Sequence, residues 1–247
     1  MTMISVELVP RSEASLKNES RLIKYLLPSV TTINIPDLPH FYLRSWDGAC
    51  ATKEYFKHSI PHIRAIDFEL KDDLPIAEFL QKNDISSVLV VNGDKPQWLT
   101  RNVYDTTSID MIRLIKRRIP DMHVYAALDQ YRNSIKKEID YAKEKINAGA
   151  DGFFTQPFFD LRLMEMYAEQ LKSSEVFYGV SPVCSGGAKQ YWEKKNNAVF
   201  PEKFYPCRWW NKIFAKKALD FVKERNANIY FMPIKIDALD YLLDVLG

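Results

Sequence analysis

The sequence predicts a (β/α)8 barrel, also called a TIM barrel, that spans residues 1–247 as a single domain. Short apolar runs alternate with longer amphipathic stretches about eight times along the chain. The length of 247 residues is one that α/β barrels commonly reach as one domain. No linker-like segment interrupts the alternation. A doubly wound open sheet is the main structural alternative.

The apolar runs are short and rich in β-branched and aromatic residues, which is typical of buried strands. Parallel strands need long crossovers, and helices must cover the faces of the sheet, so each run is expected to be followed by a helix. The predicted strands are residues 3–9, 28–35, 61–67, 86–92, 122–127, 151–156, 177–181 and 228–232.

The stretches between the runs carry helical periodicity. Residues 134–147 place Ile135, Ile139, Ala142 and Ile146 on one face and charged residues on the other. Gly149 then follows as a C-terminal stop. Three more helices are expected: residues 108–119, which Pro120 ends, residues 160–173, which Asp160 caps, and residues 211–225.

One connection is unusually long. Residues 182–212 follow the seventh predicted strand, hold three of the five tryptophans, and offer few candidates for a core-facing stripe. Long loops in compact domains are often functional, and in a barrel this one would lie on the catalytic face. We therefore expect a structured loop here.

The composition excludes several classes of protein. Lys and Arg number 34 against 32 Asp and Glu, which argues against a charge-driven nucleic-acid binder. No apolar run approaches the roughly 20 residues that cross a bilayer, and the N-terminus lacks a signal peptide's basic region. The three cysteines are far apart and odd in number, which argues against a disulfide framework. A cytoplasmic protein without a membrane or nucleic-acid partner is expected.

Polar residues that end apolar runs are the candidate site, because barrel chemistry collects at the carboxyl ends of strands. Glu7 is flanked by apolar residues, so desolvation would raise its pKa and suit it to act as a general acid; a solvent-facing position is the alternative. Asp94 lies in an Asn-Gly-Asp sequence that is also typical of a turn, and Gln156 is also typical of a cap. A lone histidine such as His62 is more often structural than catalytic.

Two further features bear on the site. Glu138 and Lys145, taken alone, are expected to be solvated surface charges. No cluster of Cys and His has metal-ligand spacing, so no metal is expected.

The segment EIDYAKEKINAGADGFFTQPFFD, residues 138–160, is the most specific motif. It resembles the helix-strand signature of methylenetetrahydrofolate reductases, flavin-dependent (β/α)8 barrels of one-carbon metabolism. Further segments match this family in chain order. SVELVP resembles its S-F-E-F-F-P strand, TINIPDLP its I-N-V-P-D-N-P segment, PHIRAID its H-L-T-C-x-D strand, VLVVNGD its strand ending in R-G-D, and residues 229–247 its last strand and helix.

The resemblance implies roles for three residues. Glu7 matches the general acid that helps open the five-membered ring of methylenetetrahydrofolate, Asp94 the aspartate near flavin and pterin, and Gln156 the glutamine that holds the pterin. The implied reaction is hydride transfer from reduced FAD to the methylene carbon, giving 5-methyltetrahydrofolate, with NADH or NADPH as the electron donor. Trp192 and Lys235 fall near two further substrate-binding positions of the family.

The resemblance also assigns a cofactor shell, which departs from the family pattern in several places. Asn92 stands where the family has arginine, Glu138 where it has aspartate, and Lys235 where it has arginine. The Y-P-E-G-H loop is replaced by residues 127–131. The cofactor-binding positions implied are His62, Asn92, Gly93, Tyr104, Ala126, Tyr131, Glu138 and Lys145.

Two alternative functions remain open. The first is a flavin-free, folate-binding barrel of the methyltransferase type. The second is a non-catalytic or partner-dependent subunit whose aromatic loop 191–210, with Trp209 and Trp210, docks another protein. A homo-oligomer or a protein electron donor is the partner expected beside the folate.

Overall fold

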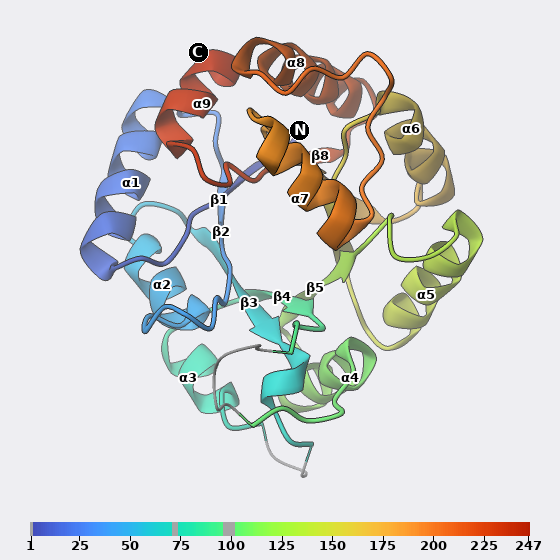
Figure 1. Cartoon of the computed structure of the whole chain (residues 1–247). Helices are drawn as coiled ribbons and strands as arrows, with labels where there is room; N and C mark the ends of the chain where they lie inside the picture. Colours follow the sequence, from blue (N-terminus) through green and yellow to red (C-terminus); the bar gives the residue numbers. More distant parts are fainter. Residues whose placement is uncertain (1, 71–73, 96–101) are drawn as a thin grey trace.

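The computed structural model describes residues 2–70, 74–95 and 102–247, and within them the chain forms a closed barrel of parallel strands (Figure 1). The strands follow one another in chain order, and the last pairs with the first. The predicted (β/α)8 fold is confirmed. The strands are β1 Ile4–Glu7, β2 Thr32–Ile35, β3 His58–Arg64, β4 Ser87–Val91, β5 His123–Leu128, β6 Gly152–Pro157, β7 Glu175–Val180 and β8 Asn228–Phe231.

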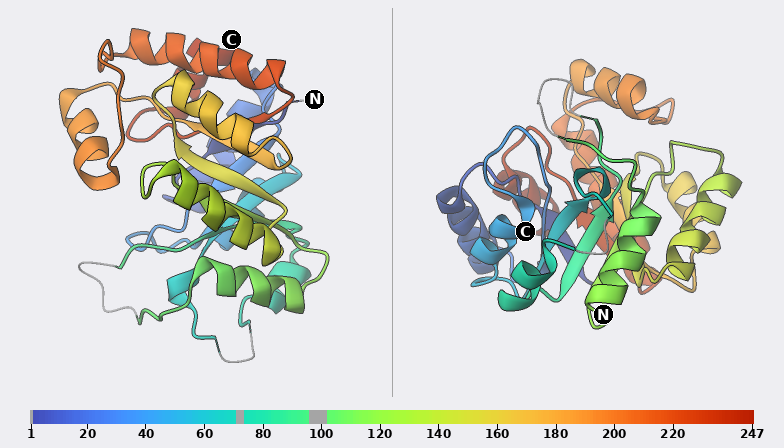
Figure 2. Two further views of the ribbon diagram at one scale, coloured as in Figure 1. Left: turned by 90° about the vertical axis from the view of Figure 1, so that its right-hand side faces the viewer. Right: turned by 90° about the horizontal axis from the view of Figure 1, so that it is seen from below.

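Helices surround the barrel, as the two side views in Figure 2 also show. They are α1 Glu13–Leu26, α2 Ser45–Thr52, α3 Ala77–Lys82, α4 Ser108–Arg118, α5 Ile135–Asn147, α6 Leu161–Gln170, α7 Gly186–Asn196, α8 Arg208–Glu224 and α9 Ala238–Leu246, with a short 3-10 helix, η1, at Ala65–Asp67. The expected caps are confirmed: Asp160 accepts a hydrogen bond from the Arg162 amide at the start of α6, and Gly149, with φ of 112°, follows α5. No helix among the described residues is both long enough and apolar enough to span a bilayer.

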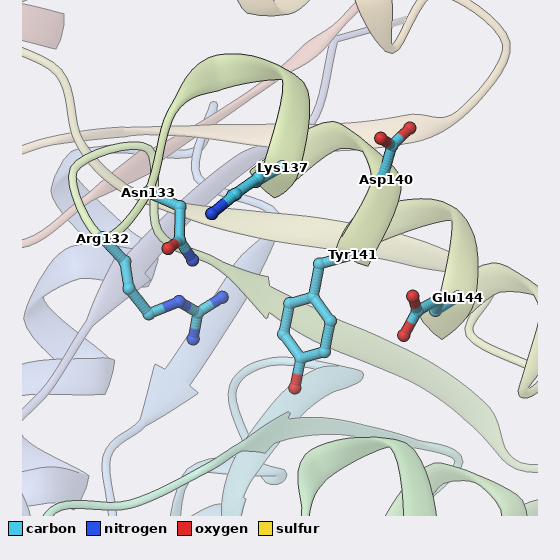
Figure 3. A pocket seen from close by; sticks show the side chains of 6 residues that line it. All are labelled: Arg132, Asn133, Lys137, Asp140, Tyr141 and Glu144. Carbon is cyan, nitrogen blue, oxygen red and sulfur yellow. The ribbon is translucent and has the colours of Figure 1, made fainter.

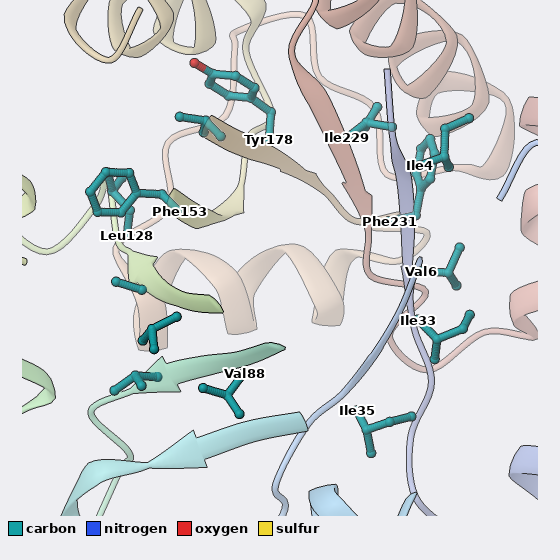
Figure 4. Close-up of a cluster of buried hydrophobic side chains, with 14 of the residues drawn as sticks. Ile4, Val6, Ile33, Ile35, Val88, Leu128, Phe153, Tyr178, Ile229 and Phe231 are labelled. Atoms are coloured by element: carbon teal, nitrogen blue, oxygen red, sulfur yellow. The ribbon is translucent and has the colours of Figure 1, made fainter. Parts of the chain in front are cut away.

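The strands bury both of their faces, because side chains alternate along each strand. Outward side chains pack against the helices, and Figure 4 shows fourteen of them, among them Val6, Ile33 and Phe231. Inward side chains fill the barrel with a second cluster: Ile60, Leu89, Tyr125, Phe154, Phe177, Tyr230 and Met232. Phe154 and Phe177 stack at 4.2 Å, and Tyr125 and Tyr230 meet Phe154 edge-on. Closely packed aromatic side chains therefore fill the interior of the barrel below its carboxyl end.

The bounds of the third strand differ from the predicted residues 61–67. The third strand begins three residues before 61 and ends at Arg64, where η1 takes over. Pro61 is tolerated inside it because the pairing with β2 ends at Pro61 and the pairing with β4 begins at His62.

The connection 182–212 is not a loop throughout, since it contains α7. Ser185 caps α7 by accepting from the Ala188 amide, and Trp192 anchors the helix in a cluster with Phe159 and Phe204. Figures 1 and 2 place α7 across the carboxyl end of the barrel, so the segment does lie on the face where the site was expected.

Gly179 on β7 is required by a close approach of the neighbouring strand. A Cβ there would lie 2.7 Å from the Thr155 carbonyl oxygen and 2.8 Å from that of Gln156. These contacts follow from an irregularity in the β6–β7 register between Phe154 and Pro157. Gly179→Ala is expected to lower the free energy of unfolding by about 2–3 kcal/mol through overpacking, measured by urea unfolding.

Gly187→Ala is the matched control for this substitution. A Cβ at Gly187, in the first turn of α7, meets no atom within 4 Å, and alanine favours a helix. Its stability is expected to equal or exceed that of the unaltered protein. Equal unfolding midpoints for the two variants would contradict the close approach.

Candidate active site

Glu7 ends β1 on the inner face of the barrel. Ile4 and Val6 point outward into the helix-facing core, so Ser5 and Glu7 point inward. The Tyr230 hydroxyl donates a hydrogen bond to Glu7 Oε2. Burial raises the pKa of Glu7 to about 7, and the hydrogen bond from Tyr230 partly opposes that rise. A carboxyl group that titrates near neutral pH is suited to proton transfer.

Tyr230 is a further residue of the candidate site that the sequence reasoning did not single out. It lies on the inner face of β8, is buried, and meets Phe154 edge-on at 5.1 Å. Burial, followed by the nearby Glu7 carboxylate, raises its pKa well above the usual value, so it remains a hydrogen-bond donor. The alternation within residues 228–232 is the signal that places its ring inside.

Tyr230→Phe is expected to raise the pKa of Glu7 further, because it removes the one interaction that lowers it. The lost hydrogen bond is expected to cost about 1–2 kcal/mol of stability. Carboxyl-carbon NMR of the protein through a pH titration measures the pKa directly. Tyr42→Phe, at a fully exposed tyrosine, is the control and is expected to change neither quantity. A Glu7 pKa that stays the same or falls would contradict the assignment.

A cavity of about 410 Å³ opens beside Glu7, and Lys235 lines it as well. Lys235 has a φ of 58°, and its Nζ lies 5.6 Å from the centre of the Tyr191 ring on α7. Arg11 is a second cation at this cavity. The structure therefore brings together a proposed acid and a proposed substrate-binding lysine that are far apart in sequence.

His62 lies on the inner face of β3 and is buried. Its Nε2 is 3.2 Å from Asn34 Oδ1, and Asn34 Nδ2 donates to Ser5 Oγ at 2.6 Å. Because the Asn34 amide nitrogen is the donor to Ser5, its oxygen accepts, and His62 carries its proton on Nε2. Burial lowers the pKa of His62 to about 3, so the ring is neutral at physiological pH.

Asn92, Gly93 and Asp94 follow β4. Asn92 Oδ1 accepts from the Ser108 amide at 3.0 Å and so caps α4. Gly93 has a φ of 92°, and a Cβ there would lie 3.0 Å from Ile66 Cγ1. Asp94 has an exposed side chain, and its carbonyl oxygen accepts from Arg64 Nη2 at 2.7 Å. Within the described contacts, the Asp94 carboxylate and the Asn92 Nδ2 group remain free for a ligand.

Gln156 lies at the carboxyl end of β6, in the irregular part of that strand. Its side chain is half-buried. Its carbonyl oxygen accepts from Gln130 Nε2 at 2.8 Å, which ties the segment after β5 to β6. The position at the barrel mouth agrees with the one expected for a ligand-holding amide, and its role stays a prediction.

Glu138 and Lys145 on α5 are buried, so their interpretation as solvated surface charges was wrong. Glu138 accepts from Arg132 Nη2 at 2.8 Å and from the Asp129 amide at 3.2 Å. Lys145 Nζ donates to the Ala127 carbonyl at 2.6 Å and lies 4.2 Å from the Tyr141 ring centre. The buried stripe of α5 is thus shifted, and Ile146, expected in the core, is exposed.

The remaining expected cofactor positions are engaged in contacts within the protein. The Tyr131 hydroxyl donates to the Pro157 carbonyl at 2.9 Å, and burial raises its pKa. Ala126 points outward into the core beneath the helices. The Tyr104 amide donates to the Ile66 carbonyl at 2.8 Å. Trp192, expected near substrate, is buried in the cluster under α7, 5.6 Å from Phe159.

A second cavity of about 500 Å³ lies along α5, and Figure 3 shows its lining side chains. Arg132 and Tyr141 extend to the same side of the helix there, and the Arg132 guanidinium lies 4.9 Å from the Tyr141 ring centre. Lys145 contacts the same ring but does not line this cavity. Among the described residues, no group of three His, Cys, Asp or Glu side chains is arranged to hold a metal ion.

The aromatic segment 191–210 is largely folded inward. Trp210 stacks on Phe214 at 5.2 Å and meets Phe204 at 4.5 Å. Trp209, Tyr205 and Tyr191 are the segment's exposed aromatic side chains, at 69%, 68% and 47%. The prediction that Trp209 and Trp210 form one docking surface therefore needs correction, because Trp210 belongs to the protein's own packing.

Comparison with known proteins agrees with this barrel. The sequence profile of methylenetetrahydrofolate reductase matches residues 44–206. The 5,10-methylenetetrahydrofolate reductase of Buchnera aphidicola subsp. Schizaphis graminum (strain Sg) is 24% identical over 151 residues, which are 58% of this chain and 50% of that protein. The chain thus matches about half the length of this curated relative.

Solved structures show the same fold. An uncharacterized protein from Clostridium thermocellum that binds two copies of 5-methyl-5,6,7,8-tetrahydrofolic acid has a TM-score of 0.65 at 12% identity, over 99% of this chain and 94% of that one. A 2,3-dimethylmalate lyase of the PEP mutase/isocitrate lyase superfamily has a TM-score of 0.59 at 11% identity, over 95% and 75%. Identities this low show the barrel fold alone.

Proposed function

This chain belongs to the methylenetetrahydrofolate reductase family, and we propose that it binds a reduced folate at the carboxyl-end mouth of its barrel and protonates it with Glu7. The observation that carries the proposal is the half-buried Glu7 carboxyl at the cavity, whose pKa of about 7 is set by desolvation and by the hydrogen bond from Tyr230. The folate-binding barrel from Clostridium thermocellum supports the ligand class.

The proton has a defined task in this chemistry. In 5,10-methylenetetrahydrofolate the methylene carbon bridges N5 and N10. A proton given by Glu7 to N10 lets the N10–carbon bond break, and the electron pair of that bond stays on N10. The nitrogen N5 then supplies its lone pair to the carbon as an iminium. Glu7 is protonated in about half of the molecules at pH 7, so it can both give the proton and recover it.

The second half of the family's reaction is the reduction of this carbon to the methyl group of 5-methyltetrahydrofolate. A bound FAD would supply the hydride, and NADH or NADPH would reduce the FAD. The residues expected to hold FAD do not fit it. Lys145 is buried, packs on the Tyr141 ring and donates to the Ala127 carbonyl, and Glu138 is engaged by Arg132.

The contacts of three other expected cofactor positions also do not fit FAD. Asn92 caps α4, Ala126 faces the outer core, and the Tyr131 hydroxyl is bonded to Pro157. We derive no step through FAD for this reason. These contacts favour the flavin-free, folate-binding barrel as the second candidate function, in which ring opening and folate binding occur without a resident flavin.

Two measurements test the proposal. Calorimetry with 5-methyltetrahydrofolate tests binding, and release of labelled formaldehyde from 5,10-methylenetetrahydrofolate tests ring opening, because water that adds to the iminium carbon expels formaldehyde. The second assay needs no reductant. We expect saturable binding and accelerated release. A protein that neither binds the folate nor accelerates release would refute the proposed function.

The absorption spectrum of the purified protein tests the cofactor separately. A colourless protein that does not quench the fluorescence of added FAD is expected from the engaged Lys145 and Arg132. A stoichiometric yellow flavin would show that these side chains rearrange. Hydride transfer from FAD would then be the favoured reading.

A further inference from the structure

Arg64 is a charged side chain inside the barrel that the proposed chemistry does not yet use. It lies on the inner face of β3, two residues beyond His62, and is only 7% exposed. In the H-L-T-C-x-D strand of the resemblance, this position is threonine. A guanidinium at such a position costs free energy unless its donors are satisfied.

The described contacts satisfy only part of the Arg64 guanidinium. Its Nε donates to Asp67 Oδ1 at 3.3 Å, and its Nη2 donates to the Asp94 carbonyl oxygen at 2.7 Å. Asp67 is itself held by Arg44, which forks onto Asp37 at 2.9 and 2.7 Å. For Nη1, no partner is found among the described residues. The guanidinium is therefore fixed in orientation and retains the donors of Nη1 for a ligand.

The surroundings indicate what kind of ligand these donors meet. Arg44 and Arg64 are balanced by Asp37 and Asp67, and Arg64 also donates to the Asp94 backbone carbonyl. An anion therefore gains little here. A neutral group that accepts a hydrogen bond fits a guanidinium whose charge is already balanced.

The position relative to Glu7 fits one reduced folate. Glu7 pairs with Asn34 in the adjacent strand, and Asn34 contacts His62 in the next one. Asn34 pairs with Ile60 in β3, so Arg64 lies two strand spacings from Glu7, about 10 Å across the strands, and four residues, about 13 Å, further along β3. A bicyclic pterin with its N10 substituent can bridge these two groups.

We propose that Arg64 binds the pyrimidinone edge of the pterin, a role that the family resemblance does not assign to it. Arg64 Nη1 donates to the 4-oxo oxygen. This assignment rests on the proposed folate function and adds to it a specificity-determining residue, Arg64, whose side chain departs from the family pattern.

Binding of two ligands to the unaltered protein is the first test. Calorimetry compares 5-methyltetrahydrofolate with its 4-amino-4-deoxy analogue, in which a donor replaces the 4-oxo acceptor. We expect the 4-oxo compound to bind at least about tenfold more tightly, because the analogue leaves the Arg64 donors unpaired. Equal affinities would overturn the proposal, whatever the variants do.

Arg64→Met tests the residue itself. It is expected to weaken 5-methyltetrahydrofolate binding about ten- to a hundredfold, the range for a hydrogen bond from a charged donor, and to abolish the preference between the two ligands. Arg64→Lys keeps the positive charge but lacks the planar guanidinium, and it is expected to retain part of the preference. Thermal melting shows whether Arg64→Met folds, and Arg64→Lys replaces it in the test if it does not.

Arg21→Met is the matched control, since Arg21 lies on the exposed face of α1 and bonds only Asn18 within the described contacts. It is expected to leave both affinities unchanged. A preference that survives in both Arg64 variants would overturn the role of Arg64. If the unaltered protein binds neither ligand, the proposed folate function fails, and that result is distinct from equal binding of both.

Discussion

Glu7→Gln is expected to slow the release of formaldehyde from 5,10-methylenetetrahydrofolate by about 10²- to 10⁴-fold, the usual contribution of a positioned general acid. Glutamine has the shape of glutamic acid and still accepts a hydrogen bond from Tyr230, but it has no proton to give. Binding of 5-methyltetrahydrofolate, which already lacks the ring to be opened, is expected to remain close to that of the unaltered protein.

The pH dependence of this rate is a second test of Glu7 as the general acid. The rate is expected to fall as the pH rises through about 7, where Glu7 loses its proton. Glu19→Gln is the control, because Glu19 lines the same cavity but is paired with Arg11 at 3.7 Å. Equal losses in Glu7→Gln and Glu19→Gln would contradict a specific acid at Glu7.

The second large effect is expected on acid stability, through His62. Burial lowers the pKa of His62 from 6.5 to about 3 in the folded protein. Below pH 6.5 the unfolded chain takes up a proton that the folded protein refuses, so stability falls as the pH falls. At 1.36 kcal/mol per pKa unit, the loss reaches about 5 kcal/mol near pH 3.

Urea unfolding at a series of pH values measures this loss as a difference between the unaltered protein and His62→Gln. The variant keeps a donor for Asn34 Oδ1 but does not titrate. We expect the unaltered protein to lose about 5 kcal/mol relative to the variant between pH 6.5 and pH 3. A difference that does not change with pH would show that His62 is solvated in the folded state.

Glu7 changes the folding stability in the opposite direction over an overlapping range of pH. Its folded pKa of about 7 lies above the ordinary 4.5, so the folded protein holds a proton that the unfolded chain has released. Stability is therefore lost as the pH rises from 4.5 to 7, by about 3 kcal/mol. The Glu7→Gln protein is expected to lack this loss, so its stability should rise more steeply across that range.

The spacing of apolar residues predicted the barrel well, because in both strands and helices this spacing is set by which side chains are buried. All eight predicted strands are present within a few residues, since a strand covered on both faces is apolar throughout. The start of β3 was missed because Pro61 looks like a strand boundary, whereas the change of pairing partner at that residue makes it harmless. The helix α7 was missed because its stripe is narrow and its anchor, Trp192, packs on residues from other elements.

The candidate site was predicted less completely. Glu7 was recognised from its apolar flanks, but Tyr230 was not, since nothing in the chain links residues so far apart. The burial of Glu138 and Lys145 escaped detection for a similar reason. Their partners are Arg132, the Asp129 amide and the Ala127 carbonyl, which the turn after β5 brings onto α5.

The sequence by itself determined the eight-fold alternation, the inward position of Glu7 and membership of a family, because alternation and motifs are local properties of a chain. Closure of the barrel decided the rest. It placed Tyr230 against Glu7, engaged Lys145 within the protein, and set Arg64 beside Asp94. Proton affinity and hydrogen-bond satisfaction depend on which groups share a buried space, and only the tertiary structure determines that.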